Sequence, residues 1–132
     1  MIAEEMLANR KPWILVDKVI EWKEGDFLVA QKNITSSDFF VQGHFPQRSI
    51  YPGMLLVEGA KQSAELLLIA SGYERQEFQL TELKAKFFRP ILPGDAVRFQ
   101  VNWVNQEKQK GNLVTVGLLD NIVVLRCNLK IL

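Results

Sequence analysis

The chain contains one histidine, His44, which lies in the irregular segment Gly43-His44-Phe45-Pro46. An imidazole is the natural proton acceptor near neutral pH, so His44 is the first candidate for a general base. Glu58 follows fourteen residues later, in the first turns of a segment rich in helix-forming residues. Taken alone, each has an ordinary structural explanation: His44 as a packed loop residue, and Glu58 as a charge that favours the helix dipole.

The residues just before Glu58 supply a third part of a reaction site. Tyr51-Pro52-Gly53 leads into the helix, and proline at a helix start leaves backbone N–H groups pointing out of the helix end. Gly53 has no side chain to obstruct an approaching oxygen. A base, an acid and free N–H donors around one helix terminus are the parts needed for an α,β-elimination next to a carbonyl. The sequence therefore predicts one site formed by His44, Glu58 and Gly53.

Strand patterns flank this helix on both sides in the sequence. Residues 13–20 and 27–34 are rich in β-branched and aromatic side chains, and the turn residues 23–26 between them indicate a hairpin. Residues 35–52 form a long loop, which in a small domain is often functional. Four more strands are expected at residues 80–89, 96–105, 113–119 and 122–131, with turns at 93–95, 110–112 and 120–121. This order indicates a single α+β domain over residues 1–132, in which a curved antiparallel sheet wraps one long central helix.

The expected helix, residues 53–69, is apolar around most of its circumference and should therefore be largely buried. Its polar side chains are spaced at i, i+3, i+4 and i+7, which places them in one polar stripe formed by Glu58, Lys61, Gln62 and Glu65. Gln62 lies one turn after Glu58 and could hydrogen-bond that carboxylate and fix its rotamer. Ser71-Gly72 ends the helix.

Composition narrows the classes of function. Sixteen basic and 15 acidic residues give a net charge of +1, which does not favour nucleic acid as the main partner. The lone Cys127 excludes an internal disulfide and a thiolate metal cluster, fits a reducing compartment, and is expected to be a packed strand residue. Residues 1–10 lack a secretory-signal pattern, and the longest apolar run, residues 66–70, is too short to cross a bilayer. We therefore expect a cytoplasmic protein without membrane insertion, metal site or cofactor.

Several blocks of the sequence resemble one enzyme family. Gly43-His44-Phe45-Pro46, Tyr51-Pro52-Gly53-Met54 and Glu58-Gly59-Ala60-Lys61-Gln62 are similar to the GHFP, PGV and EAxAQ motifs of the FabZ-like 3-hydroxyacyl-(acyl carrier protein) dehydratases, which have the hot-dog fold. Residues 10–19 are similar to the family's RYPFLLVDRV, and residues 84–95 to its KAKFRRPVxPGD. The blocks occur in the family's order and spacing and cover nearly the whole chain.

The resemblance implies an activity and a set of roles. His44 of one protomer would act as the base and face Glu58, the acid, of its partner, while the Gly53 N–H binds the thioester oxygen. The substrate would be a phosphopantetheine-linked 3-hydroxyacyl chain on acyl carrier protein, in fatty-acid or related polyketide or polyene biosynthesis. A homodimer is implied, alone or as three dimers together, with an acyl tunnel along the interface. Our candidates for substrate binding, for most of which core packing is the equal alternative, are Gln62, Phe39, Phe40, Phe45, Tyr51 and Phe88.

This chain departs from the family pattern at two places. Gln47-Arg48-Ser49 stands where the family usually has Gly-His or Gly-Asn, and Gly59 and Lys61 replace an alanine and an apolar residue. Lys61 could pair with Glu58, although a general acid must carry a proton. Alternatively, its stem lies over apolar surface and its charge stays in water.

The basic residues Arg48, Lys84, Lys86 and Arg89 would form a rim suited to an acidic carrier protein if they gather near the tunnel mouth. A solvated strand face explains Lys84 and Lys86 equally well. Two other functions stay open besides the dehydratase, and the departures from the family pattern bear on the second of them. One is a hot-dog acyl-thioesterase, and the other is a non-catalytic subunit that binds acyl carrier protein.

Overall fold

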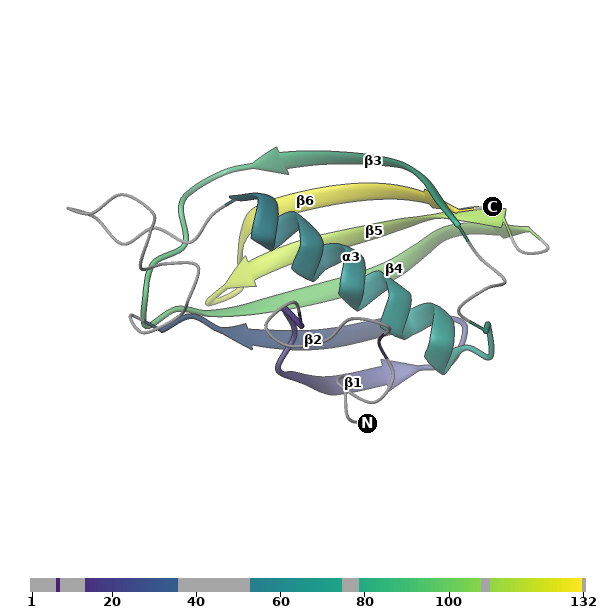
Figure 1. Cartoon of the computed structure of the whole chain (residues 1–132), viewed down its shortest axis with the longest axis horizontal. Helices are drawn as coiled ribbons and strands as arrows, with labels where there is room; N and C mark the ends of the chain where they lie inside the picture. Colours follow the sequence, from purple (N-terminus) through teal and green to yellow (C-terminus); the bar gives the residue numbers. More distant parts are fainter. Residues whose placement is uncertain (1–6, 8–13, 36–52, 75–78, 108–109, 132) are drawn as a thin grey trace.

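The computed structural model describes residue 7 and residues 14–35, 53–74, 79–107 and 110–131. These residues form one antiparallel sheet whose strands lie in the order β1-β2-β4-β5-β6-β3, with α3 across one of its faces (Figure 1). The elements are β1 (Lys18–Lys23), β2 (Phe27–Asn33), α3 (Gly53–Ala70), β3 (Leu80–Phe87), β4 (Ala96–Glu107), β5 (Lys110–Leu119) and β6 (Ile122–Ile131). The α+β architecture, with strands before and after α3 in the sequence, matches the expectation.

The first strand begins later than the sequence predicts. Residues 14–17 have no regular secondary structure, and β1 runs instead over Lys18–Lys23. The physical reason is that Leu15 and Val16 are buried and that the Leu15 N–H donates to a side chain, Gln62 Oε1, at 2.8 Å. The hairpin turn itself is confirmed at residues 24–26, where Gly25 has a φ of +71°.

The expected turn at residues 110–112 is wrong, because these residues belong to β5 and pair with residues 105–107 of β4. Gly111 is explained by close packing instead of by a turn. A Cβ at this position would lie 2.5 Å from the Asn105 carbonyl oxygen and 2.7 Å from the Trp103 ring. The turn at 120–121 is confirmed, and both Asp120 and Asn121 have positive φ there.

The helix α3 packs on the sheet chiefly against β2, β4, β5 and β6. A Cβ on Gly59 would lie 2.9 Å from the Phe99 ring of β4, so glycine allows the helix to approach the sheet closely. The buried Thr115 of β5 donates its hydroxyl to the Ala60 carbonyl oxygen at 3.3 Å. Ala60 therefore marks the side of α3 that faces the sheet. The helix ends at Ala70, one residue beyond the expected end, and Gly72 has a φ of +97°.

Candidate active site

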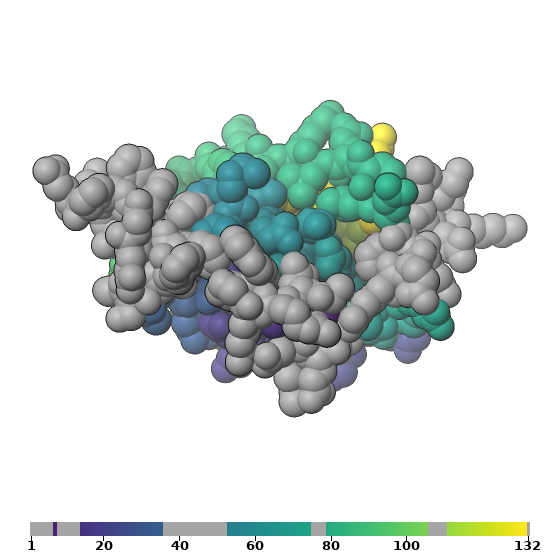
Figure 2. All heavy atoms as spheres, in the orientation of Figure 1, coloured from purple at the N-terminus to yellow at the C-terminus, as the bar shows by residue number. Residues whose placement is uncertain are grey.

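Glu58 lies in the second turn of α3, on the side away from the sheet. Two residues along a helix correspond to a rotation of about 200°, so Glu58 points opposite to the sheet-facing Ala60. Its side chain is 35% exposed, which leaves the carboxyl group half-buried and accessible. Figure 2 shows atoms of α3 open to view on this face of the molecule, beside β3. The predicted acid is therefore placed where a substrate can reach it.

Gln62 holds one oxygen of Glu58. It is fully buried, and its Nε2 donates to Glu58 Oε1 at 3.3 Å, while its Oε1 accepts the Leu15 N–H at 2.8 Å. The prediction that Gln62 hydrogen-bonds this carboxylate is confirmed. Leu15 was not expected at the site, because its contact with Gln62 spans 47 residues and no local sequence pattern predicts it.

Lys61 lies between two carboxylates of the polar stripe. Its Nζ is 3.9 Å from Glu58 Oε1 and 3.5 Å from Glu65 Oε1. The side chain is also 35% exposed, so it pairs with Glu58 while part of it still contacts water. Of the two explanations for Lys61, the structure therefore supports the ion pair.

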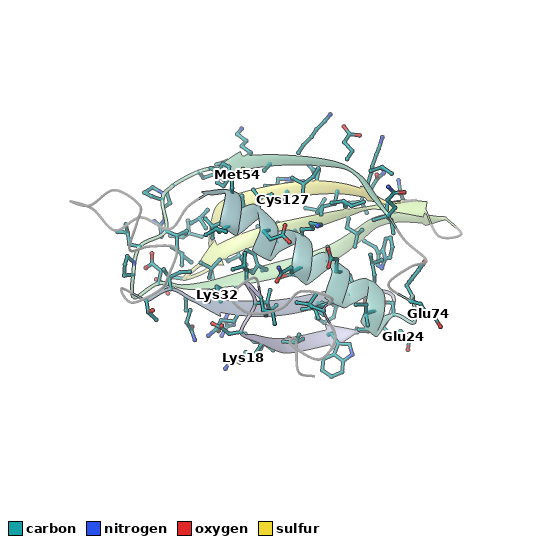
Figure 3. All side chains as sticks on the ribbon, in the orientation of Figure 1. Lys18, Glu24, Lys32, Met54, Glu74 and Cys127 are labelled. Atoms are coloured by element: carbon teal, nitrogen blue, oxygen red, sulfur yellow. The ribbon has the colours of Figure 1, made fainter. Side chains whose placement is uncertain are left out.

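Gly53 is the first residue of α3, and an aromatic ring packs directly against it. A Cβ at Gly53 would lie 3.2 Å from two ring atoms of Phe87 on β3. Next to this contact, Met54 is 76% exposed, and it is labelled at the start of the helix in Figure 3. Phe87 and Phe88 are 47% and 50% exposed. The sequence analysis named Phe88 as a substrate-binding candidate but did not name Phe87. Phe87 lies on the same face of β3 as Leu83 and Ala85, because alternate residues of a strand point to the same side.

A model of the FabA-like domain matches residues 7–127, which is nearly the whole chain. The chain belongs to the FabA-like family. The predicted resemblance is confirmed, and the polar stripe of α3 lies inside the matched range.

Curated relatives of this FabA-like chain agree with the family model. The 3-hydroxyacyl-(acyl carrier protein) dehydratase FabZ of Rhodospirillum rubrum is 35% identical over 128 residues, which covers 91% of this chain and 78% of the relative. The protein of the same name from Yersinia enterocolitica is 33% identical over 124 residues, covering 91% and 74%.

Solved structures confirm the hot-dog fold of this FabA-like domain. The dehydratase heterocomplex ApeI:P from Xenorhabdus doucetiae superposes with a TM-score of 0.78 at 17% identity, covering 99% of this chain and 90% of that one. The PaaI protein of Escherichia coli gives a TM-score of 0.71 at 20% identity, covering 86% and 80%. At these identities the likeness establishes the fold.

Two residues of the predicted basic rim, Lys84 and Lys86, lie on the outer face of the FabA-like sheet. On β3, Ala85 pairs with the buried Cys127, whereas Lys84 and Lys86 pair with the exposed Asn128 and Arg126. Lys84 and Lys86 therefore lie on the face opposite to α3 and Glu58. Lys84 Nζ is 3.3 Å from Glu82, and both line a hollow of about 350 Å³ on that outer face.

Arg89 and a cation–π contact of Lys86 complete the described part of the basic rim. Arg89 is exposed and follows the end of β3. Lys86 keeps its ammonium 5.4 Å from the centre of the Phe88 ring, a cation–π distance. Arg48 lies outside the described residues, as do His44, Phe39, Phe40, Phe45 and Tyr51. The meeting of His44 with Glu58 thus stays a prediction.

Other reactive groups in the FabA-like domain fit structural roles. Cys127 is fully buried on β6, as expected for a packed strand residue, and burial raises the pKa of its thiol to about 11. Among the described residues, no group of three or more His, Cys, Asp or Glu side chains is arranged to hold a metal ion. Within the same residues, no helix has both the length and the apolarity needed to cross a bilayer.

Proposed function

We propose that this chain is a 3-hydroxyacyl-(acyl carrier protein) dehydratase of fatty-acid biosynthesis. It is a hydro-lyase that converts the (3R)-3-hydroxyacyl thioester into the trans-2-enoyl thioester. The observation that carries the proposal is the placement of Glu58. Its half-buried carboxyl group lies near the amino end of α3, faces away from the sheet, and has one oxygen held by Gln62. The FabZ relatives, at 33% and 35% identity, are named for this reaction.

The elimination needs one base, one acid and a donor for the thioester oxygen. His44 removes the proton from the α-carbon, and the electron pair of that C–H bond forms the double bond to the β-carbon. The bond between the β-carbon and its hydroxyl breaks, and the hydroxyl takes the proton of Glu58 and leaves as water. Negative charge develops on the thioester oxygen, where the N–H of Gly53 at the start of α3 stabilises it. After the elimination His44 holds the proton from the α-carbon and Glu58 has lost one, so transfer of a proton from His44 back to Glu58 restores the enzyme, and the substrate has lost one water in total.

The edge of the sheet at β3 supports a homodimer. Among the described residues, β3 pairs with β6 alone, and the exposed Phe87, Phe88 and Met54 lie around its carboxyl end. An unpaired strand edge beside exposed aromatic side chains is a natural template for a second copy of the chain. Pairing through β3 would bring a neighbouring protomer next to the start of α3, where His44 of one protomer can meet Glu58 of the other. Assembly of such dimers in threes is a further step of the same proposal.

Acyl carrier protein is the proposed carrier of the substrate. Of the basic residues on and after β3, Lys86 and Arg89 are the better docking candidates, because Glu82 offsets the charge of Lys84 at 3.3 Å. Arg48 completes the proposed set. We also propose that residues 1–132 form one domain and that the protein works in the cytoplasm.

The test is an assay of the purified protein with 3-hydroxyacyl chains of several lengths on acyl carrier protein. Mass spectrometry of the carrier follows loss of water, and a thiol reagent follows hydrolysis. We expect enoyl product from the wild type, and a loss of about 10²- to 10⁴-fold in kcat for both His44→Ala and Glu58→Gln. The matched control Glu21→Gln changes an exposed carboxylate on β1 and should keep wild-type activity.

The other outcomes overturn the proposal. Free thiol without enoyl product would indicate the thioesterase. Binding of the loaded carrier without any turnover would indicate the non-catalytic subunit. Wild-type rates in both variants would show that elimination uses other residues.

A further inference from the structure

The hydrogen bonds around Glu58 allow its two oxygens to be told apart. The Leu15 N–H is buried and needs an acceptor, which it finds in Gln62 Oε1 at 2.8 Å. This contact fixes which end of the Gln62 amide faces Leu15, because the NH₂ group cannot accept a hydrogen bond. The NH₂ group must then face Glu58, as observed at 3.3 Å from Oε1. Gln62 therefore approaches Glu58 only as a donor.

The second neighbour of the same oxygen is also only a donor. Lys61 Nζ lies 3.9 Å from Glu58 Oε1, and an ammonium group has no lone pair with which to accept. Its other contact is Glu65 Oε1 at 3.5 Å, one turn further along α3. Lys61 is thus drawn between two carboxylates, and the nearer one, Glu65, keeps its side chain along the polar stripe.

We propose that Lys61, held by Glu65, is a positioning residue that together with Gln62 reserves Oε1 of Glu58 as a hydrogen-bond acceptor. This inference rests on the proposed function, in which Glu58 is the acid. Among the described residues, a proton on Oε1 would face the Gln62 NH₂ donor and the positive charge of Lys61 and meet no acceptor, so the proton of the acid resides on Oε2. Oε2 is then the oxygen that meets the hydroxyl of the substrate. Lys61 acts through Glu58 and does not touch the reacting atoms.

Lys61 stands at a position where the family resemblance predicts an apolar side chain, and the proposed role explains the lysine there. In this chain an apolar residue at 61 would leave Gln62 as the one donor to Oε1 among the described residues. The carboxyl group could then rotate and present either oxygen with its proton. A less well oriented acid lowers the rate of the chemical step and leaves the binding of the acyl chain unaffected.

The experiment compares Lys61→Met with Lys61→Arg in the dehydratase assay. Met keeps the apolar stem and removes the donors, whereas Arg keeps both the charge and the donors. We expect Lys61→Met to lower kcat by about three- to fivefold at unchanged KM, as for loss of a half-exposed ion pair, and Lys61→Arg to retain most of the rate. The matched control is Lys23→Met, which breaks a lysine–carboxylate pair of the same i,i+3 spacing at Asp26, in a turn beside the carboxyl end of α3 and away from Glu58 near its amino end.

A second variant tests the part played by Glu65. Glu65→Gln removes the charge that holds Lys61, so it should lower kcat in the same direction and by less than Lys61→Met. The double variant Lys61→Met/Glu65→Gln should be no slower than Lys61→Met alone, because Glu65 affects the rate through Lys61 in this inference. A slower double variant with additive effects would contradict the inference.

The results separate this inference from the proposed function. If the wild type produces enoyl thioester and Glu58→Gln does not, the function stands. Lys61→Met with wild-type kcat, or with a raised KM and unchanged kcat, would then overturn the role of Lys61 alone. If Lys61→Met lowers kcat but Lys61→Arg fails to rescue it while both variants unfold at the wild-type temperature, the donors are not what matters and the inference is also overturned. A wild type without dehydratase activity would remove the proposed function first.

Discussion

The two sides of α3 differ in what they contribute to the protein. The residues that face the sheet are small or apolar. Gly59 packs against the Phe99 ring, and Leu67, two turns beyond Ala60, is fully buried. The opposite side carries the polar stripe, whose lysine and carboxylates are partly exposed and paired with one another. Because one helix separates the two surfaces, packing can be optimised on one side without constraining the charged groups on the other. We expect substitutions on the two sides to affect different measurements.

Leu67→Ala tests the packed side and should have the largest effect on stability. Leu67 is 0% exposed and lies seven residues from Ala60, on the same helix face. Truncation leaves a cavity, and we expect the free energy of unfolding to fall by about 3 kcal/mol in a urea titration. The activity per folded molecule should stay at the wild-type level. A stable variant with impaired turnover would show that the two sides are not independent.

Cys127 extends the packed side to the inner face of β6, and it predicts a pH dependence. Burial raises the pKa of its thiol from 9.0 to about 11. Between these values the folded state keeps the proton and the unfolded chain releases it. The contribution to stability is therefore complete below pH 9 and declines by roughly 2 kcal/mol as the pH rises towards 11.

Cys127→Ala isolates this contribution from that of other groups that titrate at high pH. Urea titrations from pH 8 to pH 11 should give a shallower decline for the variant than for the wild type. Parallel curves for the two proteins would mean that the thiol titrates in the folded state as it does in the unfolded chain.

What could be predicted from the sequence follows the range of the interactions involved. The helix and its polar stripe depend on spacing within a few residues, and the structure places α3 within one residue of the expected end. The first strand and the turn at 110–112 were misplaced because distant partners decide them. Leu15 is drawn out of the sheet by Gln62, and Gly111 is required by the approach of Trp103. The contact of Phe87 with Gly53 likewise joins residues that no local pattern connects.

Thr115→Val tests the contact between α3 and the sheet. The Thr115 hydroxyl donates to the Ala60 carbonyl oxygen at 3.3 Å, and its side chain is fully buried. Valine keeps the shape and removes the donor, and the Ala60 carbonyl can still accept within the helix. We therefore expect a loss of about 1 kcal/mol in the free energy of unfolding and no change in kcat. A loss above about 3 kcal/mol would mean that this hydrogen bond, more than apolar packing, holds α3 on the sheet.

Glu58→Gln should have the smallest effect on stability and the greatest on activity. The side chain is 35% exposed, and its ion pair with Lys61 is long at 3.9 Å, so little of the folding free energy depends on the charge. The amide oxygen of glutamine can still accept the hydrogen bond from Gln62 Nε2. We expect the free energy of unfolding to change by less than about 0.5 kcal/mol, as measured by urea titration beside the activity assay. Since the amide cannot supply the proton that leaves with the hydroxyl, turnover is lost in a protein that folds as well as the wild type. If stability fell together with activity, the polar stripe would be part of the packed structure, and the two sides of α3 would not have separate roles.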